Sequence, residues 1–322
     1  MSGSALVIET PRVSVLVPSK DEADNLPEFM RQAAETFAAS PGLYEVIVID
    51  DGSADNTRTV LEELKHVYPF LRVVHHRTRR GIADALRSGY LAARGDVLVF
   101  YPADLQFKPE DIPSLVTPIL DGEVDMMTGY KQGQYDKAFV SGIYNRLSRS
   151  LFEIPVRDLN SVKAYRREVM ANLPARPDWH RYMIVVAAAQ GYSVGEVPVP
   201  VYPRRAGRSK FGLSRIPVGV LDMLAVWFEL RFARKPLLLF GMLGAGLFVA
   251  GVITGIIAVL YRLIAGVGFR PLLTLVETCL LLGSVFFATG LIAELIAAQR
   301  AELTELRRTV DRLLARDTTT DR

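Results

Sequence analysis

The chain has 322 residues, and its 38 Lys and Arg against 35 Asp and Glu give a formal net charge of +3. This near balance excludes a disordered polyelectrolyte and a protein held to nucleic acid by bulk charge, because both depend on a strong excess of one sign. The single cysteine, Cys279, excludes an internal disulfide framework and a cysteine-based zinc site. Hydrophobic residues make up 50% of the chain and are concentrated in its last third.

Short β-branched runs alternate with amphipathic stretches in the first two thirds of the chain. The runs that we predict to be strands are 13–17, 45–49, 72–75, 96–100 and 124–128. Strands that alternate with helices indicate an α/β domain with a mostly parallel, Rossmann-like sheet covered on both faces. Ligands of such sheets bind beyond the carboxyl ends of the strands. Functional residues should therefore directly follow the strand runs.

Acidic clusters follow three of these runs, in the segments 18–22, 50–55 and 101–106. A carboxylate after a strand commonly caps the next helix, so each cluster alone has a structural explanation. Together they predict a cation site, and oxygen-only ligands favour Mg²⁺ or Mn²⁺ over zinc. The sequence has no Gly-x-x-x-x-Gly-Lys-Ser/Thr and no Gly-x-Gly-x-x-Gly motif, so it supports neither a P-loop nor a dinucleotide-binding fold.

An ordered set of motifs adds to this interpretation. They are Val-Ser-Val-Leu-Val-Pro-Ser-Lys-Asp-Glu (13–22), Val-Ile-Asp-Asp-Gly-Ser-Ala-Asp-Asn-Thr (48–57), Arg-Gly-Ile-Ala-Asp-Ala-Leu-Arg-Ser-Gly (80–89), Ala-Arg-Gly-Asp (93–96), Ala-Asp-Leu-Gln (103–106) and Arg-Arg-Ala-Gly-Arg-Ser-Lys (204–210). The set resembles the family 2 glycosyltransferases of GT-A fold, and more narrowly the dolichol-phosphate mannose synthase and polyprenyl-phosphate glycosyltransferase branch. The resemblance covers about residues 11 to 298.

This resemblance implies the inverting transfer of a sugar from a UDP- or GDP-sugar to a polyprenyl phosphate at the cytosolic face of a membrane. It places Pro18, Lys20 and Glu22 in the first nucleotide-binding loop. It also places Ile49 and Asp51 at the base and the ribose of the donor.

The third acidic cluster is implied to hold the donor diphosphate and the metal ion. Ala103, Asp104 and Gln106 match that segment, with Asp104 and Gln106 as ligands of Mg²⁺ or Mn²⁺. Relatives usually read Asp-Ala-Asp here, whereas this chain has Pro102 in place of the first carboxylate. Either the first acid is dispensable, or metal affinity is reduced, or the protein no longer catalyses. We expect the first, because the rest of the site remains intact.

Basic residues are implied to neutralise the departing diphosphate. Lys131 falls where relatives have an arginine near the diphosphate, and Arg204 and Lys210 match a basic pair that grips phosphates. We therefore expect Asp104, Arg204 and Lys210 to be catalytic. Asp158 either orients a basic residue or the acceptor, or caps its own loop. No catalytic base is expected, because a phosphate monoester has its second pKa near 6 and is already anionic at neutral pH.

Two apolar runs predict a membrane hairpin, 236–261 and about 271–293, separated by a short loop. The first has 26 residues without a formal charge, more than a hydrocarbon core of about 30 Å requires. Basic residues are more frequent outside the loop, so the positive-inside rule places both termini in the cytoplasm. Glu277 lies inside the second run, and we expect it to pair with Arg262 or Arg270. No cleaved signal peptide is expected.

These features divide the chain into four parts. We expect a cytosolic GT-A domain (1–210), interfacial helices (211–235), the transmembrane hairpin (236–298) and a cytosolic tail (299–322). The expected location is a bacterial-type inner (plasma) membrane, with the bilayer, the nucleotide sugar and the polyprenyl phosphate as partners and no nucleic acid. Apolar residues at helical spacing in the tail favour a homo-oligomer.

Two other functions compete with this hypothesis. A catalytically silent relative would bind a nucleotide sugar or a lipid phosphate as a sensor or assembly subunit, and Pro102 is its support. A transporter is disfavoured, because two helices offer little room for a substrate path.

Overall fold

The structure is a computed structural model that describes residues 10–133, 151–152, 156–171, 173, 179–203, 216–232 and 235–320. Arg204 and Lys210 therefore lie outside the described residues. The chain forms two compact units, Met1–Met223 and Leu224–Arg322.

The first unit is built on a seven-stranded sheet with the strand order β3-β2-β1-β4-β6-β5-β7. Strand β6 runs antiparallel to both of its neighbours, and the remaining neighbouring pairs are parallel. The strands are β1 Val13–Ser19, β2 Tyr44–Asp50, β3 Leu71–His75, β4 Val97–Phe100, β5 Met126–Gln132, β6 Lys163–Arg166 and β7 Val194–Pro200. The predicted α/β class with a mostly parallel sheet is confirmed.

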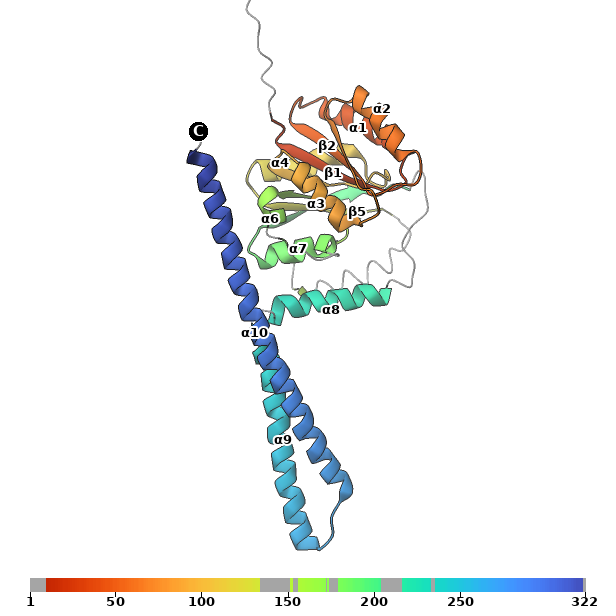
Figure 1. Cartoon of the computed structure of the whole chain (residues 1–322). Helices are drawn as coiled ribbons and strands as arrows, with labels where there is room; N and C mark the ends of the chain where they lie inside the picture. The colour runs from red at the N-terminus through yellow and green to blue at the C-terminus, as the bar shows by residue number, and fades with distance from the viewer. Residues whose placement is uncertain are drawn as a thin grey trace, which may run out of the picture. The chain divides into compact units, whose positions relative to one another are not determined.

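Helices cover both faces of this sheet (Figure 1). Side chains of α1, α2 and α4 pack with Val15 and Val17 on one face, whereas those of α3, α6 and α7 pack with Leu16 on the other. The helices are α1 Leu26–Phe37, α2 Thr57–Val67, α3 Ile82–Ala92, the 3₁₀ turn η1 Pro109–Asp111, α4 Ile112–Leu120, α6 Arg167–Ala171 and α7 Trp179–Ala189. Because successive strand residues point to opposite faces, burial on both faces explains why the strands read as continuous apolar runs.

A buried polar network ties the amino-terminal ends of the central strands together. Glu45, which is 3% exposed, accepts hydrogen bonds from the Ser14 hydroxyl (2.6 Å) and the Arg94 backbone N–H (2.7 Å) and pairs with Arg72 (3.1 Å). A Cβ on Gly95 would lie 2.7 Å from the Arg12 carbonyl oxygen, so no side chain fits there. The Ala-Arg-Gly-Asp motif therefore has a structural role, at the edge opposite the carboxyl ends of the parallel strands.

The second unit contains α9 (Pro236–Ala265) and α10 (Arg270–Thr320), which form an antiparallel hairpin (Figure 1). The segments Pro236–Ala265 and Arg270–Leu303 are long and apolar enough to cross a membrane. Their backbones touch, because a Cβ on Gly244 would lie 2.6 Å from the Phe287 nitrogen and 2.7 Å from the Gly283 oxygen. At the open end of the hairpin, the Leu237 N–H donates to the Glu294 carboxylate (3.1 Å), which satisfies a first-turn amide of α9.

Two features of the apolar segments differ from the expectations or extend them. In the described part of the chain, Glu277 forms no ion pair with Arg262 or Arg270, so the expected pair is wrong; the side chain is exposed on the hairpin surface. Helix α10 continues through 299–320 without a break. The helix that we expected to lie in the membrane interface is present as α8 (Ile216–Phe232).

Candidate functional site

The first two acidic clusters meet beyond the carboxyl ends of β1 and β2. The Lys20 ammonium donates to the Gly52 carbonyl oxygen (2.9 Å), and the Glu22 backbone N–H donates to the Thr57 hydroxyl (3.0 Å). The Asp21 carboxylate accepts from the Ala54 N–H at 2.8 Å. These contacts bind the two loops into one surface, as expected for residues that follow adjacent parallel strands.

Asp51 is buried and holds the loop between β3 and α3. Its carboxylate accepts from the backbone N–H groups of Arg80 (2.7 Å) and Gly81 (2.8 Å) and contacts His76 Nδ1 (2.9 Å). Burial alone would raise the pKa of Asp51, but the hydrogen bonds from His76, Arg80 and Gly81 outweigh it and lower the pKa below its ordinary value. His76 is 9% exposed and stabilises this loop, a role that no sequence motif predicted.

The third cluster forms a tight loop after β4. The Gln106 backbone N–H donates to the Asp104 carboxylate (3.2 Å), and Asp104 is 9% exposed. Between them, Leu105 has a φ of 57°, a left-handed conformation that is uncommon for a residue with a side chain. Among the described residues, only Asp21 and Leu105 are non-glycine residues with positive φ, and both lie in these loops. Strained backbone of this kind clusters at functional sites.

A lysine and an aspartate pair at the carboxyl end of β5. Lys131 lies 3.2 Å from the Asp158 carboxylate and donates to the Asn160 carbonyl oxygen at 3.1 Å. Asp158 is 3% exposed and also accepts from the Asn160 N–H (2.9 Å), so it both caps its turn and orients a basic residue. The two roles that the sequence left open for Asp158 are therefore compatible.

The strand order determines where the candidate site residues lie along the edge of the sheet. The β2-β1-β4-β6-β5 order places the Lys20 and Asp51 loops at one end of the edge, Asp104 in the middle and Lys131 at the other end. Four interstrand spacings of about 4.8 Å make this edge about 19 Å long. The arrangement suits an extended anionic ligand. Pro18, Ile49 and Ala103 belong to the same three strand ends and are largely or fully buried.

The oxygen atoms available at Asp104 and Gln106 suit a hard cation that also binds the diphosphate of the donor. In the described part of the chain, no group of three or more His, Cys, Asp or Glu side chains could enclose a metal ion. Asp104 can offer a carboxylate oxygen and Gln106 an amide oxygen, which fits Mg²⁺ or Mn²⁺ with a diphosphate completing the coordination shell.

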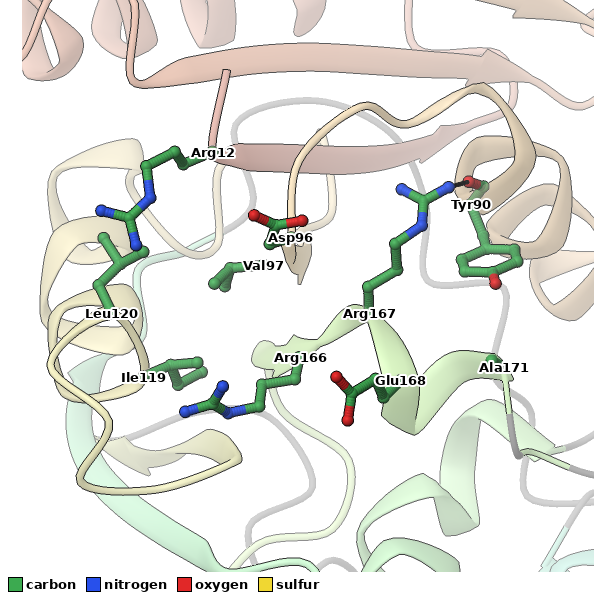
Figure 2. Close-up of a pocket in the computed structure, with 10 residues that line it drawn as sticks. All are labelled: Arg12, Tyr90, Asp96, Val97, Ile119, Leu120, Arg166, Arg167, Glu168 and Ala171. Atoms are coloured by element: carbon green, nitrogen blue, oxygen red, sulfur yellow. Dashed lines mark hydrogen bonds between the residues drawn. The ribbon is translucent and has the colours of Figure 1, made fainter. Parts of the chain in front are cut away.

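A cavity of about 460 Å³ lies at the opposite edge of the sheet (Figure 2). Arg167 is fully engaged there, donating to the carbonyl oxygens of Tyr90, Ala93 and Gly95 at 2.9 to 3.2 Å. Arg12 and Asp96 precede β1 and β4, so this cavity is remote from the carboxyl ends and separate from the candidate site. Its lining residues are Arg12, Tyr90, Asp96, Val97, Ile119, Leu120, Arg166, Arg167, Glu168 and Ala171.

Comparisons with known proteins agree with this geometry. The sequence model described as "Glycosyl transferase family 2" matches residues 14–169. The chain is 30% identical over 310 residues to a dodecaprenyl-phosphate galacturonate synthase from Rhizobium johnstonii, covering 90% of this chain and 89% of that protein. It is 28% identical over 297 residues to an undecaprenyl-phosphate 4-deoxy-4-formamido-L-arabinose transferase from Shewanella sediminis, covering 88% and 86%.

Solved structures support the fold. Glucosyl-3-phosphoglycerate synthase from Mycobacterium tuberculosis, in complex with Mn²⁺, UDP and glucosyl-3-phosphoglycerate, superposes with a TM-score of 0.55 at 21% identity, covering 71% of this chain and 85% of that one. The same enzyme with Mg²⁺ and UDP gives a TM-score of 0.53 at 22% identity, covering 68% and 79%. With the similarity to the Rhizobium synthase over 90% of this chain, these matches show that the chain belongs to glycosyltransferase family 2 and has the GT-A fold.

Proposed function

We propose that this protein transfers a sugar, with inversion, from a UDP- or GDP-sugar to a polyprenyl phosphate and so makes a polyprenyl-phosphate sugar. The observation that carries the proposal is the extent of the similarity to the dodecaprenyl-phosphate galacturonate synthase. It covers 90% of the chain and therefore includes both the sheet edge and the apolar helices. The named relatives are a synthase and transferases, which gives no support to a catalytically silent protein.

The reaction exchanges one bond for another at the anomeric carbon of the sugar. An oxygen of the acceptor phosphate forms a bond to that carbon while the bond to the donor diphosphate breaks, and the diphosphate leaves with the electron pair. The acceptor is already anionic at neutral pH, because its second pKa is near 6. The chain therefore has to position two anions and neutralise the leaving group, rather than remove a proton.

Each part of the sheet edge has a role in this proposal. The loops of Lys20 and Asp51 bind the nucleoside, and Asp104 and Gln106 hold Mg²⁺ or Mn²⁺, which would stabilise charge on the departing diphosphate. Lys131, held by Asp158, lies within the site to neutralise the same charge. Arg204 and Lys210 complete the set as proposed phosphate ligands.

The length and apolar composition of α9 and α10 support a location of this chemistry at a membrane. We propose that α9 and α10 cross the bilayer, with both termini and the catalytic unit in the cytoplasm, and that the protein forms a homo-oligomer.

The test uses the purified full-length protein with polyprenyl phosphate, Mn²⁺ or Mg²⁺ and a panel of UDP- and GDP-sugars that includes UDP-galacturonate. We expect one donor to give a lipid-linked sugar and EDTA to abolish its formation. Nucleotide binding without lipid-linked sugar from any donor would overturn the proposal. Arg204→Ala and Lys210→Ala should weaken use of the acceptor, and unchanged kinetics in both would reduce the segment 204–210 to a lipid contact.

A further inference from the structure

Lys163 is a buried lysine at the candidate site that the proposed reaction does not use. It is the first residue of β6 and lies opposite Phe100 at the end of β4 and opposite Thr128 on β5. The strand leading to Asp104 and the strand leading to Lys131 thus flank it. The side chain is 1% exposed, so it contacts no bulk solvent.

The Lys163 ammonium holds the turn that carries Asp158. It donates to the Ser161 carbonyl oxygen at 2.8 Å, and Lys131 donates to the neighbouring carbonyl oxygen of Asn160 at 3.1 Å. Two lysines on adjacent strands therefore donate hydrogen bonds to successive carbonyl oxygens of one turn. The Asp158 carboxylate lies in the same turn and contacts the Lys131 ammonium at 3.2 Å.

We propose that Lys163 is a positioning residue, which fixes the 158–161 turn through Ser161 and so holds Asp158 where it orients Lys131 in the site. The inference rests on the proposed function, in which Lys131 acts on the donor diphosphate. The Lys163 ammonium donates to the Ser161 carbonyl oxygen and lies 5.9 Å from the centre of the Phe100 ring, so its proposed effect passes through the turn.

The protonation of Lys163 makes this role measurable. Burial lowers its pKa from 10.5 to about 7, the carboxylate of Asp158 opposes the shift and the ammonium of Lys131 adds to it. His180 at the start of α7 also lies near, and it is neutral because burial, Arg181 and Lys163 lower its pKa to about 3. The unfolded chain binds the Lys163 proton more tightly than the folded chain, so this lysine destabilises the fold below about pH 7. Stability recovers as the pH rises from about 7 towards 10.5.

A lysine whose only role was to stabilise the fold would raise the melting temperature of the wild type relative to a variant that lacks it. Replacing it with Met, a side chain of similar length without a charge, would then lower the melting temperature. The positioning role predicts instead that Lys163→Met leaves the melting temperature at pH 6 unchanged or higher, yet weakens ligand binding. The two roles are therefore separated by measuring stability and binding on the same variant.

The test measures binding of UDP and of GDP, each with Mn²⁺, to the full-length protein by calorimetry, and uses the nucleotide that binds the wild type more tightly. We expect Lys163→Met to weaken binding about tenfold, as is typical when the partner of a ligand-contacting group is removed. Lys163→Arg should restore most of the affinity, because the guanidinium can also donate to the Ser161 carbonyl oxygen. Lys65→Met, on the exposed face of α2, serves as the control and should bind as the wild type does.

A double-mutant cycle decides whether Lys163 acts through Lys131. If it does, the double variant Lys131→Met/Lys163→Met should bind the nucleotide no more weakly than Lys131→Met alone. The reason is that Lys131→Met already removes the ammonium group that Lys163→Met would misplace. Additive losses, or equal affinity of Lys163→Met and wild type, overturn the inference while leaving the proposed function intact. Failure of the wild type to bind either nucleotide overturns the proposed function itself.

Discussion

The backbone N–H of Tyr202 donates a hydrogen bond of 2.9 Å to the carbonyl oxygen of Gln106. The Lys108 ammonium also lies 4.2 Å from the centre of the Tyr202 ring. Tyr202 stands two residues before Arg204, so these contacts hold the chain beside the Asp104 loop just before the basic segment 204–210 begins. These contacts therefore join the Asp104 loop to the segment that follows β7.

We predict that Asp104→Asn lowers sugar transfer by about 100-fold or more, because it removes the carboxylate that holds the cation at the leaving group. The fold should survive, since the amide can still accept the hydrogen bond from Gln106. Transfer rate and thermal unfolding are measured together, with Asp121→Asn at the end of α4 as the matched control. Full activity of Asp104→Asn would remove this residue from the site.

Pro102→Asp should strengthen metal binding. A second carboxylate next to Asp104 adds a negatively charged oxygen ligand, and the affinity of hard cations rises with ligand charge. We expect half-maximal activity at about tenfold lower Mn²⁺ concentration. A titration of activity against Mn²⁺ checks this, and Pro102→Ala separates loss of the proline ring from gain of the charge. An unchanged midpoint would show that position 102 does not reach the ion.

Asp51→Asn should destabilise the first unit and remove part of its acid sensitivity. The amide NH₂ would face N–H donors from Arg80, Gly81 or His76, and an unsatisfied buried group costs about 1–3 kcal/mol. In the wild type the folded pKa of Asp51 is lowered, so its contribution is present above the unfolded pKa and lost as the pH falls through the folded pKa.

Denaturant unfolding between pH 3 and pH 7 tests this prediction. The stability difference between wild type and Asp51→Asn should be largest at neutral pH and shrink as the pH falls below the ordinary Asp pKa of 3.8. A difference that stays constant with pH would show that the carboxylate charge is not what holds the loop.

Gly244→Ala should weaken the α9–α10 hairpin, because the new methyl group would meet backbone atoms of Phe287 and Gly283 that cannot rotate away. Overpacking of this kind costs about 2 kcal/mol. Gly246→Ala in the same helix is the matched control, since nothing lies within 4 Å of its added Cβ. Thermal stability of the full-length protein in detergent is the measurement. Equal melting temperatures of the two variants would contradict the observed contact.

The sequence predicted the five strands β1 to β5 from their short β-branched or apolar runs, but it missed β6 and β7. Strand β6 has only four residues and begins with Lys163, and a lysine normally indicates solvent. Strand β7 carries Pro198 and Pro200, which argue against a central strand. It lies at the edge of the sheet, where a missing N–H is tolerated.

The part of the site that directly follows predicted strands could also be predicted from the sequence. The loops of Lys20, Asp51 and Asp104 directly follow strands, so local sequence order brings them to one edge. The contact between Lys131 and Asp158 joins residues 27 positions apart along the chain across an antiparallel strand that the pattern did not predict. The burial of Lys163 and His76 likewise depends on the tertiary structure, which no short motif encodes.

Because α10 is one unbroken helix, a change in the tilt of its apolar segment also moves its carboxyl-terminal end. Beyond Leu303 the helix runs on to Thr320, and at about 1.5 Å per residue this extension is roughly 25 Å long. With no hinge at Leu303, a change of roughly 10° in the tilt of the apolar segment, well within the spread seen for spanning helices, swings the far end by roughly 4 Å. If the segment Arg270–Leu303 crosses a bilayer, as proposed above, the thickness of the bilayer would therefore affect the position of the carboxyl-terminal end of α10.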